Sequence, residues 1–254
     1  MADDQGVYLY AVTRDEGEGP DGLTGVAGAP VRRLAYRGLA AFLGTVPLAE
    51  FGEEPLRRSM EDLAWLEETA RAHHRVVEAV ACLRPTAPVR LVTVYTAEAQ
   101  VRELLDERYD QFDAVLRRVA GRSEWGVKAY AAPAEPVVAA AEPDATPGAA
   151  YLNRRRAALR GREADWRRAA EHAEAVHEAL MGIAVDGRRH RAQDPQLSGR
   201  PEQMVLNGAY LVDETRAAEF ARAAEEVAGQ GVVVELVGPW APYSFAALDH
   251  DGER

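Results

Sequence analysis

A glycine-rich run near the start of the chain has the spacing of a dinucleotide-binding loop. Gly17-Glu18-Gly19-Pro20-Asp21-Gly22 matches the pattern G-x-G-x-x-G and follows a stretch rich in β-forming residues. That chemistry requires a helix to begin at the glycines, so that free backbone N–H groups face the pyrophosphate. Here Pro20 follows the second glycine, two acidic residues would face the phosphates, and turn-forming sequence continues to Gly28. We therefore interpret the run as a loop and expect no cofactor.

Histidines and carboxylates offer little for metal binding. His74 and Glu78 lie four residues apart, on one face of a predicted helix, but no third ligand is close in the sequence. His172 and His177 are five residues apart, about 140° around a helix, and do not converge. The sequence predicts no metal site.

Nucleophilic catalysis has no clear candidate either. None of the four serines lies in a G-x-S-x-G turn. Cys82, the single cysteine, follows an apolar helical pattern, and we interpret it as a small buried hydrophobic residue. Neighbouring pairs such as Glu67 and Glu68 point to different sides of a helix. We find no catalytic constellation and expect a protein that is not an enzyme.

Composition and charge narrow the class of protein. The 254 residues are 47% hydrophobic, a globular value, and one cysteine excludes an intrachain disulfide framework. The net charge of −11 disfavours general attraction to nucleic acid or to anionic lipid. Neither a signal peptide nor a sufficiently long apolar segment is evident. These features predict a cytoplasmic protein with no membrane partner.

A proline-rich segment divides the chain. Pro133, Pro136, Pro143 and Pro147 fall within eighteen residues, and proline lacks the N–H that helices and inner strands need. We expect an N-terminal α+β domain over residues 1–131, a Pro/Ala-rich linker over 132–148, and a C-terminal domain over 149–254. The last domain would comprise a helix, an α+β part and an aromatic tail.

The first part of the chain alternates strand and helix patterns. Residues 6–13 predict a strand, and 31–36 with 39–46 predict a hairpin around Arg37-Gly38. An apolar stripe from Leu56 to Val80 predicts one helix, residues 89–95 a buried central strand, and Val101 to Val119 a second helix that ends at Gly121.

The second part predicts a ferredoxin-like order. A strand over 124–131 is followed by a long helix over 149–183, a strand over 204–212, a helix over 213–228 that Asp213 would cap, and a strand over 232–237. With an optional strand after the long helix, to which we assign no residues, the order is β-α-(β)-β-α-β. The fold class is therefore α+β, with two domains containing ferredoxin-like mixed or antiparallel sheets and long helices.

The long predicted helix is dense in arginine over residues 154–168, where Arg154, Arg155 and Arg162 are among seven arginines. Trp166 is the only aromatic residue nearby, so a stacking platform for nucleic acid is missing. A solvated face or an acidic protein partner fits this stretch better.

The chain closes on a proline-stiffened aromatic segment, Gly238-Pro239-Trp240-Ala241-Pro242-Tyr243-Ser244-Phe245. Its three aromatic side chains, Trp240, Tyr243 and Phe245, either fill the core of the last domain or form a preorganised apolar contact for another protein.

Five dispersed segments together carry a resemblance to a known family. They are Val7–Ala11, Pro88–Val94, Gly121–Lys128, Val205–Val212 and the aromatic segment Gly238–Phe245. In these segments the sequence resembles the gas vesicle protein F/L family, accessory proteins of prokaryotic gas vesicle assembly. Ala241 departs from the proline expected there.

The resemblance implies a non-enzymatic accessory protein at the gas vesicle, whose partners are the hydrophobic main shell protein and other accessory proteins. It supplies no catalytic, cofactor or metal residues. As a hypothesis, the partner-binding residues are Trp240, Tyr243, Phe245, Arg154, Arg155 and Arg162, and the acidic chain would limit aggregation of the shell protein during vesicle nucleation.

Two other classes stay open. One is a ferredoxin-like sensor or enzyme that binds a small molecule, which would need polar groups converging on a pocket. The other is a nucleic-acid binder that uses the arginine-rich helix. We expect neither a small-molecule substrate nor a nucleic-acid partner.

Overall fold

The computed structural model describes residues 5–131, 147–192, 202–227 and 232–246. The chain forms two compact units, one of Met1–Glu124 with Trp240–Arg254 and one of Trp125–Pro239. These bounds differ from the expected domains, because the chain from Trp240 onward is grouped with the first unit, whereas Gly238 and Pro239 belong to the end of β9 in the second. Most of the expected linker, residues 132–146, lies outside the described residues, and residues 147–148 begin a helix.

The first unit is built around β1 (Gln5–Arg14), which lies between β3 (Leu39–Pro47) and β4 (Thr86–Pro88). The predicted hairpin is confirmed: β2 (Arg32–Tyr36) pairs antiparallel with β3 across Arg37-Gly38. Both turn residues have positive φ, 51° and 81°, which suits a tight hairpin between twisted strands. The short β5 (Val94–Tyr95) also pairs with β1.

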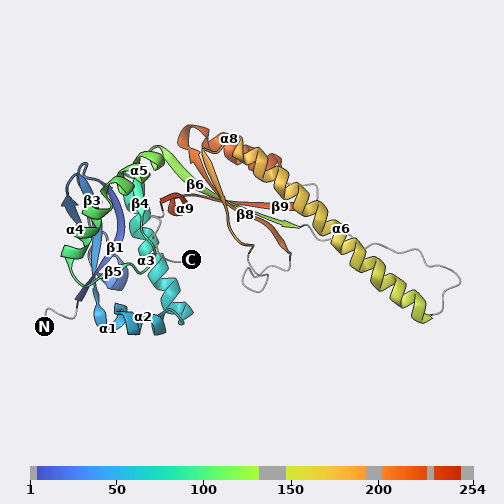
Figure 1. Ribbon diagram of the computed structural model, residues 1–254, viewed down its shortest axis with the longest axis horizontal. Helices are drawn as coiled ribbons and strands as arrows, with labels where there is room; N and C mark the ends of the chain where they lie inside the picture. The colour runs from blue at the N-terminus through green and yellow to red at the C-terminus, as the bar shows by residue number, and fades with distance from the viewer. Residues whose placement is uncertain (1–4, 132–146, 193–201, 228–231, 247–254) are drawn as a thin grey trace. The chain divides into compact units, whose positions relative to one another are not determined.

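Helices cover both faces of this sheet (Figure 1). The helix α3 (Leu63–Ala81) packs on one face, and α4 (Glu98–Glu107) and α5 (Tyr109–Val119) pack on the other. A strand buried on both faces needs no polar alternation, and the stretch from Tyr8 to Val12 is wholly buried.

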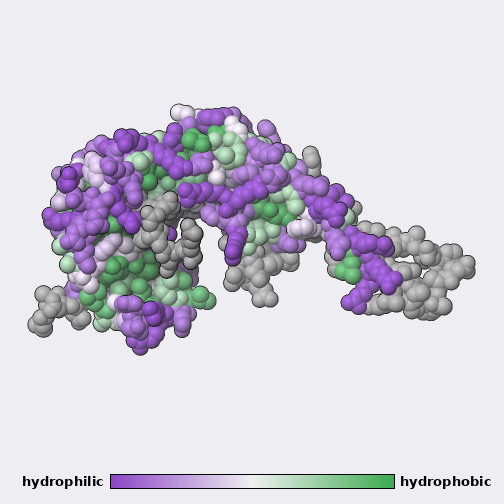
Figure 2. Space-filling view, in the orientation of Figure 1, coloured by the Kyte–Doolittle hydropathy of each residue, from purple (hydrophilic) through white to green (hydrophobic). Residues whose placement is uncertain are grey.

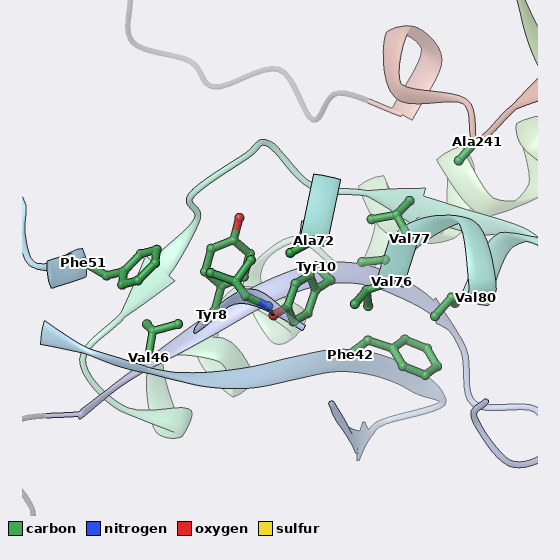
Figure 3. Close-up of a cluster of buried hydrophobic side chains, with 12 residues drawn as sticks. Tyr8, Tyr10, Phe42, Val46, Phe51, Ala72, Val76, Val77, Val80 and Ala241 are labelled. Carbon is green, nitrogen blue, oxygen red and sulfur yellow. Dashed lines mark hydrogen bonds between the residues drawn. The ribbon is translucent and has the colours of Figure 1, made fainter. Parts of the chain in front are cut away.

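A β-bulge in β1 decides which side chains meet α3. The register against β3 shifts between Leu9 and Ala11, so Tyr10 is the extra residue. Tyr10 and Ala11 consequently both join Tyr8 in the cluster under α3, whereas Leu9 and Val12 face the other side. Figure 3 shows both tyrosines in one buried cluster with Val76, Val77 and Val80 of that helix.

Three predictions for this unit were wrong. The helix expected from Val101 to Val119 is interrupted at Arg108, whose backbone is not helical, and forms α4 and α5 as two elements. The single helix expected from Leu56 to Val80 is divided into α2 (Glu53–Ser59), preceded by the short α1 (Leu48–Phe51), and α3. The Asp62 side chain accepts hydrogen bonds from the N–H groups of Ala64 and Trp65, which starts α3 anew and leaves Leu63 79% exposed.

The central strand expected over residues 89–95 is also absent as one element. Only β4 and β5 pair with β1, and the residues between them form a turn that includes Val92 at φ 56°. The Tyr8 hydroxyl accepts a hydrogen bond from the Val92 N–H, so a buried side chain from β1 takes the place of a strand ladder there.

The second unit confirms the ferredoxin-like prediction. Its elements run β6 (Arg122–Ala131), α6 (Pro147–Met181), β7 (Asp186–Arg189), β8 (Met204–Asp213), α8 (Ala217–Glu226) and β9 (Val232–Trp240). The sheet order β7-β8-β6-β9 is the one that this connectivity produces in that fold. The strand β7 takes the place of the optional strand, whose residues could not be assigned because the sequence Asp-Gly-Arg-Arg carries no apolar signal.

The helix expected at Asp213 begins later than predicted. A 3-10 turn (Glu214–Arg216) precedes α8, and the Asp213 side chain makes no capping hydrogen bond. Core residues of this unit come from both helices and the sheet, among them Val176, Leu180, Tyr210 and Phe220.

Candidate functional site

The glycine-rich run at Gly17–Gly22 forms a loop, as expected. The next helical residues are a single 3-10 turn (Val26–Gly28), which includes Ala27 in a left-handed conformation and offers no run of free N–H groups to a phosphate. The run therefore does not form a dinucleotide site.

Three of the histidines make hydrogen bonds with described residues that are distant in the sequence. The Nδ1 atom of His73 lies 3.1 Å from the Tyr8 hydroxyl, and burial lowers the pKa of His73 to about 4. His172 donates to the carbonyl of Val227, and His177 lies 2.7 Å from the Tyr210 hydroxyl. Within the described part of the chain, no group of three or more His, Cys, Asp or Glu side chains could hold a metal ion.

Cys82 is exposed, which contradicts its interpretation as a buried hydrophobic residue. The helix α3 ends at Ala81, and Cys82 is the residue that caps its C-terminus. The buried positions of α3 stop at Val80, so the apolar pattern ends before the cysteine.

From Trp240 onward, the aromatic segment belongs to the first unit. Ala241 is 6% exposed and lies in the cluster under α3, where Figure 3 draws it beside Val77. The short helix α9 (Tyr243–Ala246) packs against α5 and β4. Glu124 accepts hydrogen bonds from the backbone and the hydroxyl of Ser244, each 2.7 Å long. The segment is thus anchored by apolar contacts and by a carboxylate.

The three aromatic side chains of this segment do not form one surface. Phe245 is 1% exposed and lies under the Arg118 guanidinium, 5.9 Å from ring centre to Cζ, so its side chain belongs to the core. Trp240 is 41% exposed, and its ring meets His74 edge to face at 5.2 Å. Of the three, only Trp240 offers a large exposed aromatic surface.

Tyr243 lines a cavity of about 300 Å³ in the first unit. Its hydroxyl is buried without a hydrogen-bond partner among the described residues. Burial raises the pKa of Tyr243, and the nearby carboxylates of Glu78 and Glu124 raise it further, so the phenol keeps its proton.

The arginine-rich part of α6 is separate from the core. The C-terminal half of α6 packs on the sheet of its unit through Ala169, Ala173, Val176 and Leu180, which are all buried. The N-terminal half extends past that sheet (Figure 1). Arg155 is exposed there, whereas Arg154 and Arg162 belong to the helix but their side chains lie outside the described residues.

An apolar stripe runs along this projecting half. Leu159 is 45% exposed and Trp166 is 48% exposed, and the two are seven residues apart, so they share one helical face with the buried Ala173. We call Leu159 and Trp166 the α6 stripe. The side chains that bury the helix on its sheet are thus continued by apolar side chains with no sheet beneath them.

Hydrophilic residues surround the α6 stripe. Arg155, Arg156, Arg160, Arg167 and Arg168 are all exposed along the same helix. In Figure 2 the visible face of the projecting half is mainly hydrophilic. Sequence reasoning found the arginines and missed the stripe, although the seven-residue spacing of Leu159, Trp166 and Ala173 could have revealed it.

Membrane crossing receives no support from the described helices, none of which combines the length and the apolar run that a bilayer would require.

The sequence model of one family, described as gas vesicle synthesis protein GvpL/GvpF, matches residues 6–247 of the chain. Gas vesicle protein L of Streptomyces sp. (strain CB03234) is 44% identical over 98% of this chain and 95% of its own length. Gas vesicle protein F of the same strain is 28% identical over 94% of this chain and 98% of its own.

Solved structures share the fold. The crystal structure of GvpF from Anabaena sp. PCC7120 superimposes with a TM-score of 0.67 at 18% identity, covering 98% of this chain and 99% of that one. GvpF from Microcystis aeruginosa gives the same TM-score and identity over 96% of this chain and 99% of the other.

Proposed function

The chain belongs to the gas vesicle synthesis protein GvpL/GvpF family, and from this premise we propose that it binds the hydrophobic shell protein of the gas vesicle in the cytoplasm. In this role it is a non-enzymatic accessory protein that limits aggregation of the shell protein while vesicles nucleate. Other accessory proteins of the vesicle are its further partners.

The α6 stripe is the observation that carries this proposal. Large apolar side chains that are nearly half exposed lose water-contacting area when a partner covers them, and this burial is favourable by about 25 cal/mol per Å². Leu159 and Trp166 lie on a helix that is already held at its other end by the sheet of its unit. Because the helix is already formed, it loses little conformational entropy when an apolar segment binds to its face.

Charge supports the second part of the role. A shell protein that must face gas exposes apolar surface before it assembles, and such surface aggregates in water. The net charge of −11 makes complexes of this chain repel one another, which keeps them dispersed. The local arginines on α6 leave that overall charge strongly negative.

The test is co-expression of the shell protein with the wild-type chain, with the double variant Leu159→Glu/Trp166→Glu, or with neither. We expect the wild-type chain to raise the soluble fraction of the shell protein and to co-purify with it. The double variant should lose both effects, since it places charges where an apolar partner would bind.

Leu83→Glu is the matched control, because Leu83 is also an exposed leucine, 58% accessible, but belongs to the first unit. It should behave as the wild type. An equal soluble fraction of shell protein with and without the wild-type chain, and no co-purification, would rule the proposal out. If the double variant and the wild type behave equally, the α6 stripe is not the surface that binds the shell protein.

A further inference from the structure

The cavity beside Tyr243 is formed by segments that are distant in the sequence. Its apolar wall comes from Leu9 of β1, Val89 after β4, Leu104 of α4 and Phe112 of α5. Its volume of about 300 Å³ is at the lower end of the range for small-molecule sites, roughly 300–1,000 Å³. All of these residues belong to the first unit.

Two polar groups of this cavity are buried and unsatisfied. The Nη1 atom of Arg108 and the hydroxyl of Tyr243 each lack a hydrogen-bond partner among the described residues, although both are shielded from water. Leaving a buried donor unpaired is costly, and more so for a charged group. Both residues line the same cavity, so one molecule in it could pair with both donors.

The two charged side chains that line the cavity are arginines, whereas the carboxylates of Glu78 and Glu124 lie near the Tyr243 hydroxyl without lining the cavity. Arg90 and Arg108 line it, and among its described lining residues none is Asp or Glu. Arg108 lies between α4 and α5, where the two helices meet, and Arg90 is exposed. Neither guanidinium makes an ion pair with a described carboxylate.

We propose that this cavity binds a small monocarboxylate with an apolar body. The carboxylate accepts hydrogen bonds from Arg108 and from Tyr243, and Arg90 adds positive charge at the exposed side. The apolar body lies against Leu9 and Phe112. A carboxylate fits better than a phosphate because most of the wall is apolar and two of its donors are buried, so one charge suits it better than two.

This site is independent of the α6 stripe, which belongs to the other unit. Sequence reasoning left a small-molecule binder open but found no converging polar groups. They come together only because β1, α4, α5 and the aromatic segment surround one space.

Isothermal titration of the full chain with sodium octanoate tests the proposal, with octanol and octylammonium as matched probes that lack the carboxylate. We expect saturable 1:1 binding of octanoate, and binding of the other two at least tenfold weaker. A charged hydrogen bond of about 1.5–3 kcal/mol corresponds to about tenfold or more in the dissociation constant.

Arg108→Gln should weaken octanoate binding about tenfold or more, and Tyr243→Phe about threefold, while both should bind octanol as the wild type does. Arg75→Gln is the matched control, because Arg75 is an exposed arginine on α3 that does not line the cavity. Tyr243→Phe removes a single unpaired oxygen and is expected to fold even if the arginine variant does not.

A second arm separates a free carboxylate from a chain terminus. N-acetyl-leucyl-phenylalanine carries a peptide carboxylate, and we expect it to bind more weakly than octanoate. Tighter binding of the peptide, or no octanoate binding up to 10 mM (roughly −3 kcal/mol), would overturn the proposal. Equal octanoate affinity in Arg108→Gln and the wild type would overturn it as well.

Discussion

The carboxylate of Glu124 accepts two hydrogen bonds from Ser244, one from the backbone N–H to Oε2 and one from the hydroxyl to Oε1, both 2.7 Å. Glu124 lies in β6 and Ser244 in α9, at the end of the described chain. A carboxylate that pairs with a backbone N–H and a hydroxyl makes stronger hydrogen bonds than a neutral acceptor would. Glu124 is the last residue of the first unit before the chain enters the second, so the pair helps to hold α9 within the first unit.

Replacing Glu124 should loosen α9. Glu124→Ala removes both hydrogen bonds to Ser244, each part-buried, and we expect the local opening free energy to fall by about 1.5–3 kcal/mol. Amide hydrogen exchange at Ser244 should then be roughly ten- to hundredfold faster, while amides in the centre of β1 keep their rates.

Glu61→Ala is the control for that prediction, because Glu61 is exposed just before α3. It should leave exchange at Ser244 unchanged. Unchanged exchange in Glu124→Ala would mean that the apolar contacts of Phe245 and Ala246 suffice to hold α9.

Replacing Phe245 by alanine should destabilise the protein much more than replacing Trp240. Phe245→Ala opens a cavity beside α5 and should lower the free energy of unfolding by about 3–5 kcal/mol. Trp240→Ala, at an exposed position of the same segment, should change it by less than about 1 kcal/mol. Urea denaturation followed by circular dichroism measures both, and similar losses for the two variants would contradict the burial of Phe245.

Buried His73 should make the protein sensitive to mild acid. Its pKa is lowered from 6.5 to about 4 by burial, so between these values the unfolded chain binds a proton that the folded chain does not. Stability is therefore lost as the pH falls from about 6.5 towards 4, by about 3 kcal/mol in total from this group.

His73→Gln isolates that contribution. At pH 8 His73 is neutral in both the folded and the unfolded chain. The difference in unfolding free energy between His73→Gln and the wild type at that pH is therefore the reference value. From there to pH 4 the unfolding free energy of the variant should fall by less than that of the wild type. Parallel pH profiles for the two proteins, measured by urea denaturation, would mean that His73 is not the group responsible.

The Tyr10 hydroxyl should stabilise the fold by pairing with one buried backbone N–H. It accepts a hydrogen bond of 2.8 Å from Val26, which is 1% exposed. Tyr10→Phe leaves that N–H buried and unpaired, so we expect a loss of about 1–3 kcal/mol in unfolding free energy. Tyr36→Phe, at a partly exposed position of β2, should cost less than about 0.5 kcal/mol. Equal costs would show that Val26 finds another acceptor.

Local signals predicted much of the secondary structure. Alternation of β-forming stretches with helical stripes was enough for β1, the β2–β3 hairpin and the order of the second unit, since each element carries its own periodicity. The predictions that were wrong concern boundaries set by single contacts. Asp62 restarts α3, and the Tyr8 hydroxyl holds the turn where a strand was expected.

The partner-binding role of the six candidate residues stays a prediction. Trp240 is exposed, whereas Phe245 is buried in the core, and the sequence could not distinguish the two because an aromatic residue beside these prolines has the same pattern in either position. The α6 stripe and the cavity were missed. An apolar helical stripe predicts a buried face, and the sequence does not show where the helix extends past the sheet that buries it.

The sequence alone determined the fold class and the ferredoxin-like order, because these depend on periodicity within single segments. It also carried the family resemblance, through five short segments, and showed no recognisable catalytic motif. The tertiary structure decided which unit receives the aromatic segment, where α6 runs past its sheet, and that Arg108 and Tyr243 line one cavity. Each of these depends on residues far apart in the chain, and only folding fixes their distances.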